Sequence, residues 1–203
     1  MRDMITYGYY GKLPFAGDFL RRGLSPGFTS AWDRWLQGVM IAAPAQMGPE
    51  QWATAYFSAP IWRFSVAPQL LGPRGAVGIV MPSLDKVGRQ FPFCIAAETD
   101  LSPMAANLAL QPVADRLEAL ALEMLEEGAT LARLDAGLTA LPPPAMVDTA
   151  YGPQGGSLWV AAGTDKSRVL SLPGLPSDGA EAAALFDLDA LFWAGPPQSQ
   201  GAQ

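Results

Sequence analysis

The sequence predicts a single-domain α/β sandwich, in which helices pack against a layer of strands. Two observations support this fold class. Five or six short segments rich in β-branched and aromatic residues alternate with segments of helical periodicity. In addition, 50% of the 203 residues are hydrophobic, which suffices for a full core without disulfides. We expect the domain to cover residues 1–195 and the Pro- and Gln-rich tail, 196–203, to be disordered.

The N-terminal quarter combines a strand with a long helix. Residues 5–11 are aromatic and alternate loosely in polarity, which predicts a strand, and proline and glycine breakers predict a loop over 12–19. Apolar residues at helical spacing predict a helix over 27–41. Ser25 is its expected N-cap because a proline follows it. A short second helix is expected near 49–55.

Three strands are predicted in the middle of the chain. Residues 61–66 alternate in polarity, and 91–97 are predominantly apolar. Residues 76–81 are continuously apolar, which indicates a strand buried on both faces. The polar segment 82–90 joins the last two strands as a loop.

A long helical region is predicted over 103–127. Ser102 precedes a proline and is its expected N-cap, whereas Pro112 either kinks the helix or starts a second one. The glutamates of this region are expected on its solvated face, and Thr130 is the N-cap of a further short helix. The predicted buried stripe consists of Val113, Leu117, Leu120, Met124 and Leu125.

The C-terminal quarter is expected to add a hairpin and a last helix. Pro142–Pro144 stop the preceding helix. Residues 157–161 and 168–172 are predicted strands, and the turn-forming residues of 163–167 favour a hairpin between them. The last helix is predicted over 180–193.

Charge and hydropathy exclude several classes of partner. The net charge is −6, and the sequence contains no cluster of Lys and Arg. Duplex nucleic acid and anionic membranes both require such clusters, so we expect neither partner. No apolar run approaches the roughly 18 residues of a membrane-spanning helix, and residues 1–7 do not resemble a signal peptide. We therefore expect a cytoplasmic protein without direct membrane insertion.

The absence of histidine restricts the chemistry that the chain can perform. It excludes Ser-His-Asp and Cys-His catalysis and zinc sites with histidine ligands. Cys94 is the single cysteine, so a cysteine-based zinc site is excluded as well, and its apolar neighbours predict a buried side chain. We expect no cofactor and no metal, and any enzyme here must use carboxylates, Lys, Ser or Tyr.

Two loops carry the residue types from which a site could be built. Residues 11–19 begin like a phosphate loop but lack its second glycine and its Gly-Lys-Ser/Thr ending. The alternative is a rigid turn in which Lys12 and Asp18 are solvated or paired with each other.

The second loop, 82–92, lies between two predicted buried strands, a position that favours functional loops. Asp85 and Arg89 are spaced to form a bidentate ion pair. Ser83 and Lys86 could act as nucleophile and base if the pKa of the lysine were depressed. We favour a structural or partner-binding loop over this catalytic alternative.

These loops, taken with neighbouring segments, resemble the TagF (ImpM) family of type VI secretion-associated proteins. Residues 8–19 (GYYGKLPFAGDF) resemble the family pattern G-x-x-GK-(L/I)-P-x-x-GDF. Residues 60–64 (PIWRF) resemble a P-x-W-R-F strand, and residues 82–92 (PSLDKVGRQFP) resemble a PS-x-D-x-VGR-x-(F/Y)-P segment. Residues 32–36 (WDRWL) and 157–159 (SLW) match a helix and a late strand of the same family.

The resemblance implies a fold and a function. TagF-like proteins have a three-layer α/β/α sandwich, and we expect a mixed sheet within it. They are accessory proteins that act as post-translational repressors, some of them through protein–protein interaction with the forkhead-associated scaffold protein of the secretion system. No catalytic residues are established for the family. The resemblance therefore implies that this chain is not an enzyme but a regulator with a protein partner.

The candidate residues for partner binding or for a loop network are Lys12, Asp18, Arg63, Ser83, Asp85 and Arg89. The hypothesis is that the two loops lie side by side and form either an internal ion-pair network or a docking face. Two other functions stay open at this point. One is a small-molecule or nucleotide sensor with its pocket at residues 82–92, and the other is a histidine-free hydrolase.

Overall fold

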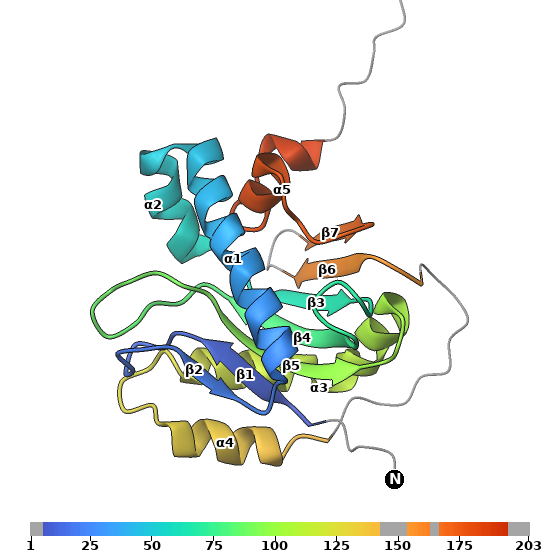
Figure 1. The fold of residues 1–203 in the computed structure, drawn as a ribbon. Coiled ribbons are helices and arrows are strands. Elements are labelled where there is room, and N and C mark those ends of the chain that lie inside the picture. Colours follow the sequence, from blue (N-terminus) through green and yellow to red (C-terminus); the bar gives the residue numbers. More distant parts are fainter. Residues whose placement is uncertain (1–5, 143–153, 163–166, 195–203) are drawn as a thin grey trace, which may run out of the picture.

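The structure is a computed structural model that describes residues 6–142, 154–162 and 167–194. In these ranges, seven strands form one open antiparallel sheet, and helices cover both of its faces (Figure 1). The strands are β1 (Gly8–Gly11), β2 (Leu20–Arg22), β3 (Trp62–Val66), β4 (Gly75–Met81), β5 (Phe93–Thr99), β6 (Ser157–Ala162) and β7 (Ser167–Leu172). The helices are α1 (Pro26–Met47), α2 (Pro49–Ser58), α3 (Pro103–Glu123), α4 (Leu131–Thr139), α5 (Gly179–Ala184) and the 3₁₀ turn η1 (Leu191–Ala194).

The predicted α/β sandwich with three layers is confirmed, with one correction to its sheet. The strand order is β2-β1-β5-β4-β3-β6-β7, and each pairing between described strands is antiparallel, whereas a mixed sheet was predicted. The continuously apolar strand β4 is buried along its whole length. That burial follows from helices on both faces and is independent of strand direction, so an apolar run does not by itself indicate parallel pairing.

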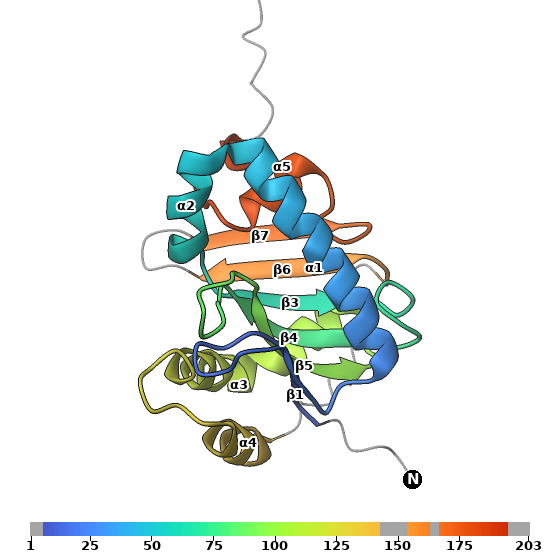
Figure 2. The same cartoon turned by 60° about the vertical axis from the view of Figure 1, so that its left-hand side comes forward.

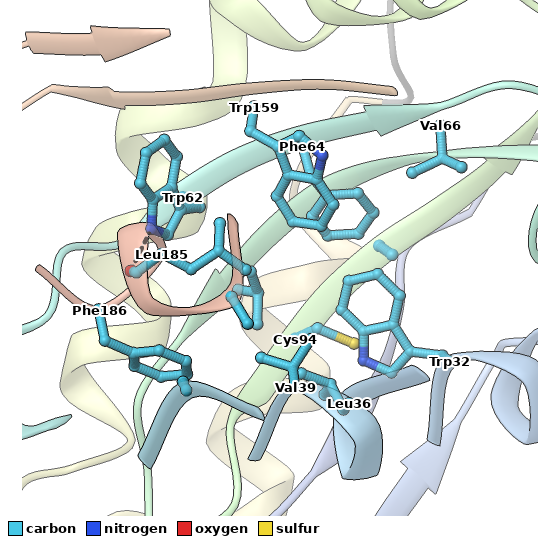
Figure 3. Packing of buried hydrophobic residues seen from close by; sticks show 14 of the residues in the cluster. Trp32, Leu36, Val39, Trp62, Phe64, Val66, Cys94, Trp159, Leu185 and Phe186 are labelled. Atoms are coloured by element: carbon cyan, nitrogen blue, oxygen red, sulfur yellow. Dashed lines mark hydrogen bonds between the residues drawn. The ribbon is translucent and has the colours of Figure 1, made fainter. Parts of the chain in front are cut away.

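One face of the sheet is covered by α1, with α2 and α5 packed beside it (Figures 1 and 2). Ser25 caps α1 as predicted, because its side chain accepts a hydrogen bond from the backbone N–H of Phe28. The core on this face is aromatic, and Figure 3 shows Trp32 and Trp159 around Phe64 and the indole of Trp62 bonded to the carbonyl of Leu185. Cys94 is fully buried in the same core, as predicted.

All six tryptophans of the chain belong to this α1 face. Trp32, Trp62 and Trp159 are buried in its core, and the other three pack against it partly buried. The opposite core contains none of them and is aliphatic, apart from Tyr9 and Phe93. The two sides of the sheet thus differ in composition.

The opposite face is covered by α3, which contacts strands β3 to β6, and by α4 (Figure 2). Pro112 lies inside α3 and neither ends it nor begins a second helix. The predicted buried stripe is confirmed except at one position. Leu125 is 39% exposed because α3 ends at Glu123, so the spacing that placed Leu125 on the buried side no longer applies there.

Other differences concern the ends of elements. The three-residue strand β2 was missed, and α1 continues to Met47 through an internal proline. The predicted last helix is divided into α5 and η1. The predicted hairpin of β6 and β7 is confirmed by their pairing, and the last residue of its predicted linker, Ser167, is the first residue of β7. Residues 163–166 of the linker, residues 143 and 144 of the predicted proline stop, and the C-terminal tail lie outside the described residues. None of the helices in the described part of the chain is both long and apolar enough to span a membrane.

Candidate functional site

The two candidate loops lie together at one end of the sheet. Strands β1 and β4 both pair antiparallel with β5, one on each side of it. The ends of β1 and β4 therefore lie beside the start of β5, where the loops of residues 12–19 and 82–92 emerge (Figures 1 and 2). The prediction that these loops lie side by side is confirmed.

The loops are in contact from their first residues. Gly11 has φ 135°, and a Cβ at this position would lie 2.3 Å from the carbonyl oxygen of Pro92. Only glycine permits this backbone approach. Farther out, the backbone N–H of Lys86 donates to the carbonyl of Ala16 at 2.9 Å. The glycines and prolines of the motif therefore hold two segments, about seventy residues apart in sequence, at backbone contact.

The charged side chains of the loops form a network around Asp85, which is fully buried. Its Oδ2 accepts from Lys12 Nζ at 3.1 Å and from Arg89 Nε at 2.6 Å, and its Oδ1 accepts from the backbone N–H groups of Val87 and Arg89. Arg89 Nη2 donates to the carbonyl of Gly17 at 2.9 Å instead of completing a bidentate pair. The network thus connects the two loops, and Arg89 bridges them.

This environment controls the ionisation of Asp85. Burial by itself would raise the pKa of the carboxyl. The hydrogen bonds from the backbone of Arg89, from the ammonium of Lys12 and from the guanidinium of Arg89 outweigh it and hold the pKa well below its ordinary value. Asp85 is therefore ionised at neutral pH and balances the buried charge of Lys12.

Ser83 is fixed by its backbone and not by its side chain. The hydroxyl of Tyr56 donates to the Ser83 carbonyl at 2.6 Å and accepts from the Ser83 N–H at 3.2 Å. The Ser83 hydroxyl is buried and has no hydrogen-bond partner among the described residues. The geometry therefore does not supply the nucleophile–base pair of Ser83 with Lys86, whose side chain is exposed.

Two of the six candidate residues lie outside the network. Asp18 is exposed, and its carboxylate accepts from the adjacent N–H of Phe19 rather than pairing with Lys12. Arg63 lies on β3 and binds two carboxylates of α3, Glu118 at 2.5 Å and Asp115 at 2.6 Å. The hydrogen bond to Glu118 raises the pKa of the Arg63 guanidinium. Arg63 therefore joins the sheet to α3 and does not belong to the loop site.

An apolar groove lies beside the two loops. We use the name end face for three exposed residues, Phe57 at the end of α2, Leu122 in the last turn of α3 and Leu125 just beyond it. The groove has a volume of about 350 Å³ and is lined by Pro14, Tyr56, Phe57, Ala59, Ile61, Met81, Pro82, Ser83, Leu84, Leu122 and Leu125. We call it the end groove.

Sequence reasoning did not find the end groove. Its walls come from four separate segments, and Leu125 was predicted to be buried. A usable signal was present in Leu122, which is apolar but does not belong to the predicted buried stripe of its helix. Within the described ranges, no group of three or more Asp, Glu or Cys side chains is arranged to hold a metal ion.

Residues 8–141 match the family described as TagF N-terminal domain, Type VI secretion system-associated. This range contains both loops and most of the sheet. The chain belongs to the TagF family. It is therefore an accessory protein associated with type VI secretion.

A solved structure supports the membership. This TagF chain is similar to the crystal structure of PA0076 from Pseudomonas aeruginosa PAO1, with a TM-score of 0.76 and 28% sequence identity. The similarity covers 91% of this chain and 96% of PA0076. A comparison with curated proteins found no match.

Proposed function

We propose that this TagF protein is a cytoplasmic post-translational repressor of type VI secretion that acts by binding another protein of the system. The observation that carries the proposal is the end face. Exposed aromatic and aliphatic side chains that gather at one site are typical of protein-binding surfaces. The loops beneath them are held rigid by the Asp85 network, so the surface needs little ordering when a partner binds.

The proposed partner is the forkhead-associated scaffold protein of the same secretion system. This choice rests on family membership and on the resemblance of the two loops to those of TagF proteins, some of which act through this scaffold. A regulator that binds the scaffold can repress assembly by occupying a surface that other components need. The proposal includes no catalytic step, and it is supported by the lack of histidine and by the Ser83 hydroxyl, which has no base as partner among the described residues.

The proposal is tested by isothermal titration calorimetry of the purified chain with the scaffold, using Phe57→Ser and Ile41→Ser variants. Both residues are exposed apolar side chains on helices, but Phe57 lines the end groove, whereas Ile41 lies on α1 and is not among the lining residues. We expect micromolar binding that Phe57→Ser weakens about tenfold or more, as hot-spot residues do, and that Ile41→Ser leaves unchanged.

A second measurement tests repression in the cell. Overproduction of the wild-type chain is expected to lower type VI secretion, and the Phe57→Ser variant at equal abundance is expected to lower it much less. Absence of scaffold binding at about 100 μM, a concentration above that of weak specific complexes, would remove the scaffold as direct partner. Unchanged secretion on overproduction would contradict repression.

The alternative function, a small-molecule sensor, is favoured by the volume of the end groove. About 350 Å³ lies within the range of ligand sites, and the lining is predominantly apolar. No cation is among the lining residues, and Lys12 and Arg89 are engaged by Asp85, so the groove suits a small apolar molecule better than a nucleotide. A thermal-shift screen of apolar compounds, with Phe57→Ser as control, would detect such a ligand.

A further inference from the structure

We propose that Gly17, Lys86 and Arg89 bind a carboxylate from an acidic segment of the partner protein. We use the name loop notch for these three residues. The inference rests on the proposed function, since it assumes a protein partner, and it adds the chemistry of the segment that is bound. It follows from two observations: two exposed cations lie against one glycine, and the fold does not supply carboxylates to neutralise both.

Lys86 reaches the notch from the second loop. Its backbone N–H donates to the carbonyl of Ala16, the residue before Gly17, at 2.9 Å. Its side chain then extends along Gly17, because a Cβ added there would lie 2.9 Å from Cε and 3.3 Å from Nζ of the lysine. The side chain of Lys86 is exposed, and within the described ranges its ammonium has no hydrogen-bond or ion-pair partner. The missing side chain at position 17 therefore leaves room for a free ammonium group.

Arg89 lies against the carbonyl group of the same glycine. Its Nη2 donates to the Gly17 oxygen at 2.9 Å, and its Nε donates to Oδ2 of the buried Asp85 at 2.6 Å. These two hydrogen bonds fix the plane of the guanidinium, although the side chain is 61% exposed. Nη1 has no partner among the described residues, so its N–H groups are available to a ligand. A guanidinium held in this way suits a carboxylate, which accepts two parallel hydrogen bonds from one.

The carboxylates of the loops do not balance these cations. Asp85 is shared between Arg89 and Lys12. Asp18 accepts from the N–H of the next residue and pairs with neither cation of the notch. Like charges that lie close together repel each other, so the notch has an unfavourable electrostatic energy in the isolated chain. A bound anion would remove that repulsion.

The charge of the loops indicates which anion fits. Residues 11–19 and 82–92 contain three cations and two carboxylates, so they are positive by one charge in a chain of net charge −6. One carboxylate balances this excess. A phosphate group, with about −1.5 to −2 charges at neutral pH, exceeds it and would lie near Asp18.

Other classes of occupant fit the notch less well. Nucleic acid requires more phosphate contacts than two cations provide. A second copy of this chain has a net charge of −6, so two copies repel each other as whole molecules. An acidic segment of a different protein is the occupant for which both the cations and the charge balance are complementary.

The first test is isothermal titration calorimetry of the full chain with the scaffold. Lys86→Gln is expected to weaken binding about three- to tenfold, as charge pairs at interfaces do, and high salt should weaken the wild-type complex. Arg116→Gln is the matched control. It removes the same charge from another exposed cation without a partner in the described residues, which lies on α3 and lines a different groove between α3 and α4. It is expected to leave binding unchanged.

Gly17→Ala tests the geometry without changing any charge. The methyl group would occupy the space along the Lys86 side chain and displace its ammonium, so binding is expected to weaken about as much as in Lys86→Gln. Gly38→Ala, with open space at its Cβ on α1, is expected to leave binding unchanged. Circular dichroism and the melting temperature check that each variant is folded.

A peptide titration tests the notch independently of the scaffold. The full chain labelled with ¹⁵N is titrated with a short glutamate-rich peptide and with the same peptide carrying glutamine at those positions. Chemical shifts detect binding even at about millimolar affinity. We expect the glutamate peptide alone to shift the amide signals of Gly17, Lys86 and Arg89, and Lys86→Gln to abolish the shifts. A third peptide carries phosphothreonine in place of the glutamates.

The outcomes separate this inference from the proposed function. If the scaffold binds and Lys86→Gln weakens the complex no more than Arg116→Gln does, the inference is wrong and the proposed function stands. If the scaffold does not bind, the peptides decide. Shifts of the notch amides with the glutamate peptide alone support an acidic partner other than the scaffold, and no selective shift overturns the inference.

Two further outcomes would also overturn it. One is binding of the phosphothreonine peptide that is about tenfold tighter than that of the glutamate peptide, which would assign the notch to phosphorylated segments. The other is a dimer of the wild-type chain in sedimentation velocity that Lys86→Gln dissociates, which would assign the notch to a second copy.

Discussion

Asp85 is the residue on which the geometry of both loops depends. It accepts two side-chain and two backbone hydrogen bonds while fully buried, and Arg89 extends its reach to Gly17 in the other loop. The spacing of Asp85 and Arg89 was sufficient to predict their contact. The participation of Lys12 could be proposed only as one of several pairings, because the sequence does not determine which of the nearby cations reaches a given carboxylate.

Replacing Asp85 by Asn tests this network through its pH dependence. Because the folded-state pKa of Asp85 lies below its unfolded value of about 3.9, the charged carboxylate stabilises the fold above that pH and loses this contribution as pH falls further. At pH 7 we expect Asp85→Asn to lower the melting temperature by about 5–10 °C, since it leaves Lys12 buried without its counter-ion. Near pH 3 the difference from wild type should shrink.

The control for this prediction is Asp18→Asn, which removes a carboxylate from the same loops but outside the network. Its melting temperature should stay within about 1 °C of wild type at both pH values, as for other exposed positions. A destabilisation by Asp85→Asn that is the same at pH 7 and pH 3 would show that the charge of Asp85 is not what stabilises the loops.

At the scale of elements, the positions of strands and helices in the sequence were predicted better than the packing of one element against another. The position of β4 follows directly from its apolar run, but nothing in that run indicates how closely β5 packs against it. Gly78 pairs with Ala96, and a Cβ on Gly78 would lie 2.1 Å from the carbonyl oxygen of Ile95. The short β2 was missed because three residues, two of them arginines, show no periodicity that pattern reasoning can detect.

Two glycine-to-alanine variants test the packing of these elements. Gly78→Ala is expected to lower the free energy of unfolding by about 1–3 kcal/mol, because backbone atoms of β5 must move to admit the methyl group. Gly38→Ala is its matched control, since Gly38 is an exposed position inside α1 with open space at the Cβ. It should raise the free energy of unfolding by about 0.4–1 kcal/mol. Urea denaturation measures both, and equal effects would contradict the close approach of β4 and β5.

At the scale of the whole molecule, one sheet serves two cores. The α1 side and the α3 side have separate sets of buried residues, and β4 contributes to both. The sandwich itself was predicted from the alternation of strands and helices. Strand direction was predicted wrongly, since burial on both faces looks the same in a sequence whichever way the strands run. The end groove was not predicted, because it forms only where four segments distant in sequence meet.

A shared sheet predicts cooperative unfolding. Unfolding of either helical layer would expose the apolar surface of β4 and β5, so the described domain should unfold in a single transition. In differential scanning calorimetry, the ratio of calorimetric to van't Hoff enthalpy should be close to one. A ratio well above one, or two resolved peaks, would show that the layers unfold separately.

The uneven distribution of tryptophan makes the two layers spectroscopically unequal. Ring centroids of Trp32 and Trp35 are 4.8 Å apart, and those of Trp35 and Trp159 are 5.3 Å apart, so these indoles form one compact group of chromophores. Tryptophan fluorescence and the tryptophan bands of near-ultraviolet circular dichroism therefore report the packing of the α1 layer. The α3 layer contributes no tryptophan to either signal. The indole of Trp52 donates a hydrogen bond to the side chain of Gln90 in the second loop. A change at that end of the sheet would therefore also alter the tryptophan fluorescence.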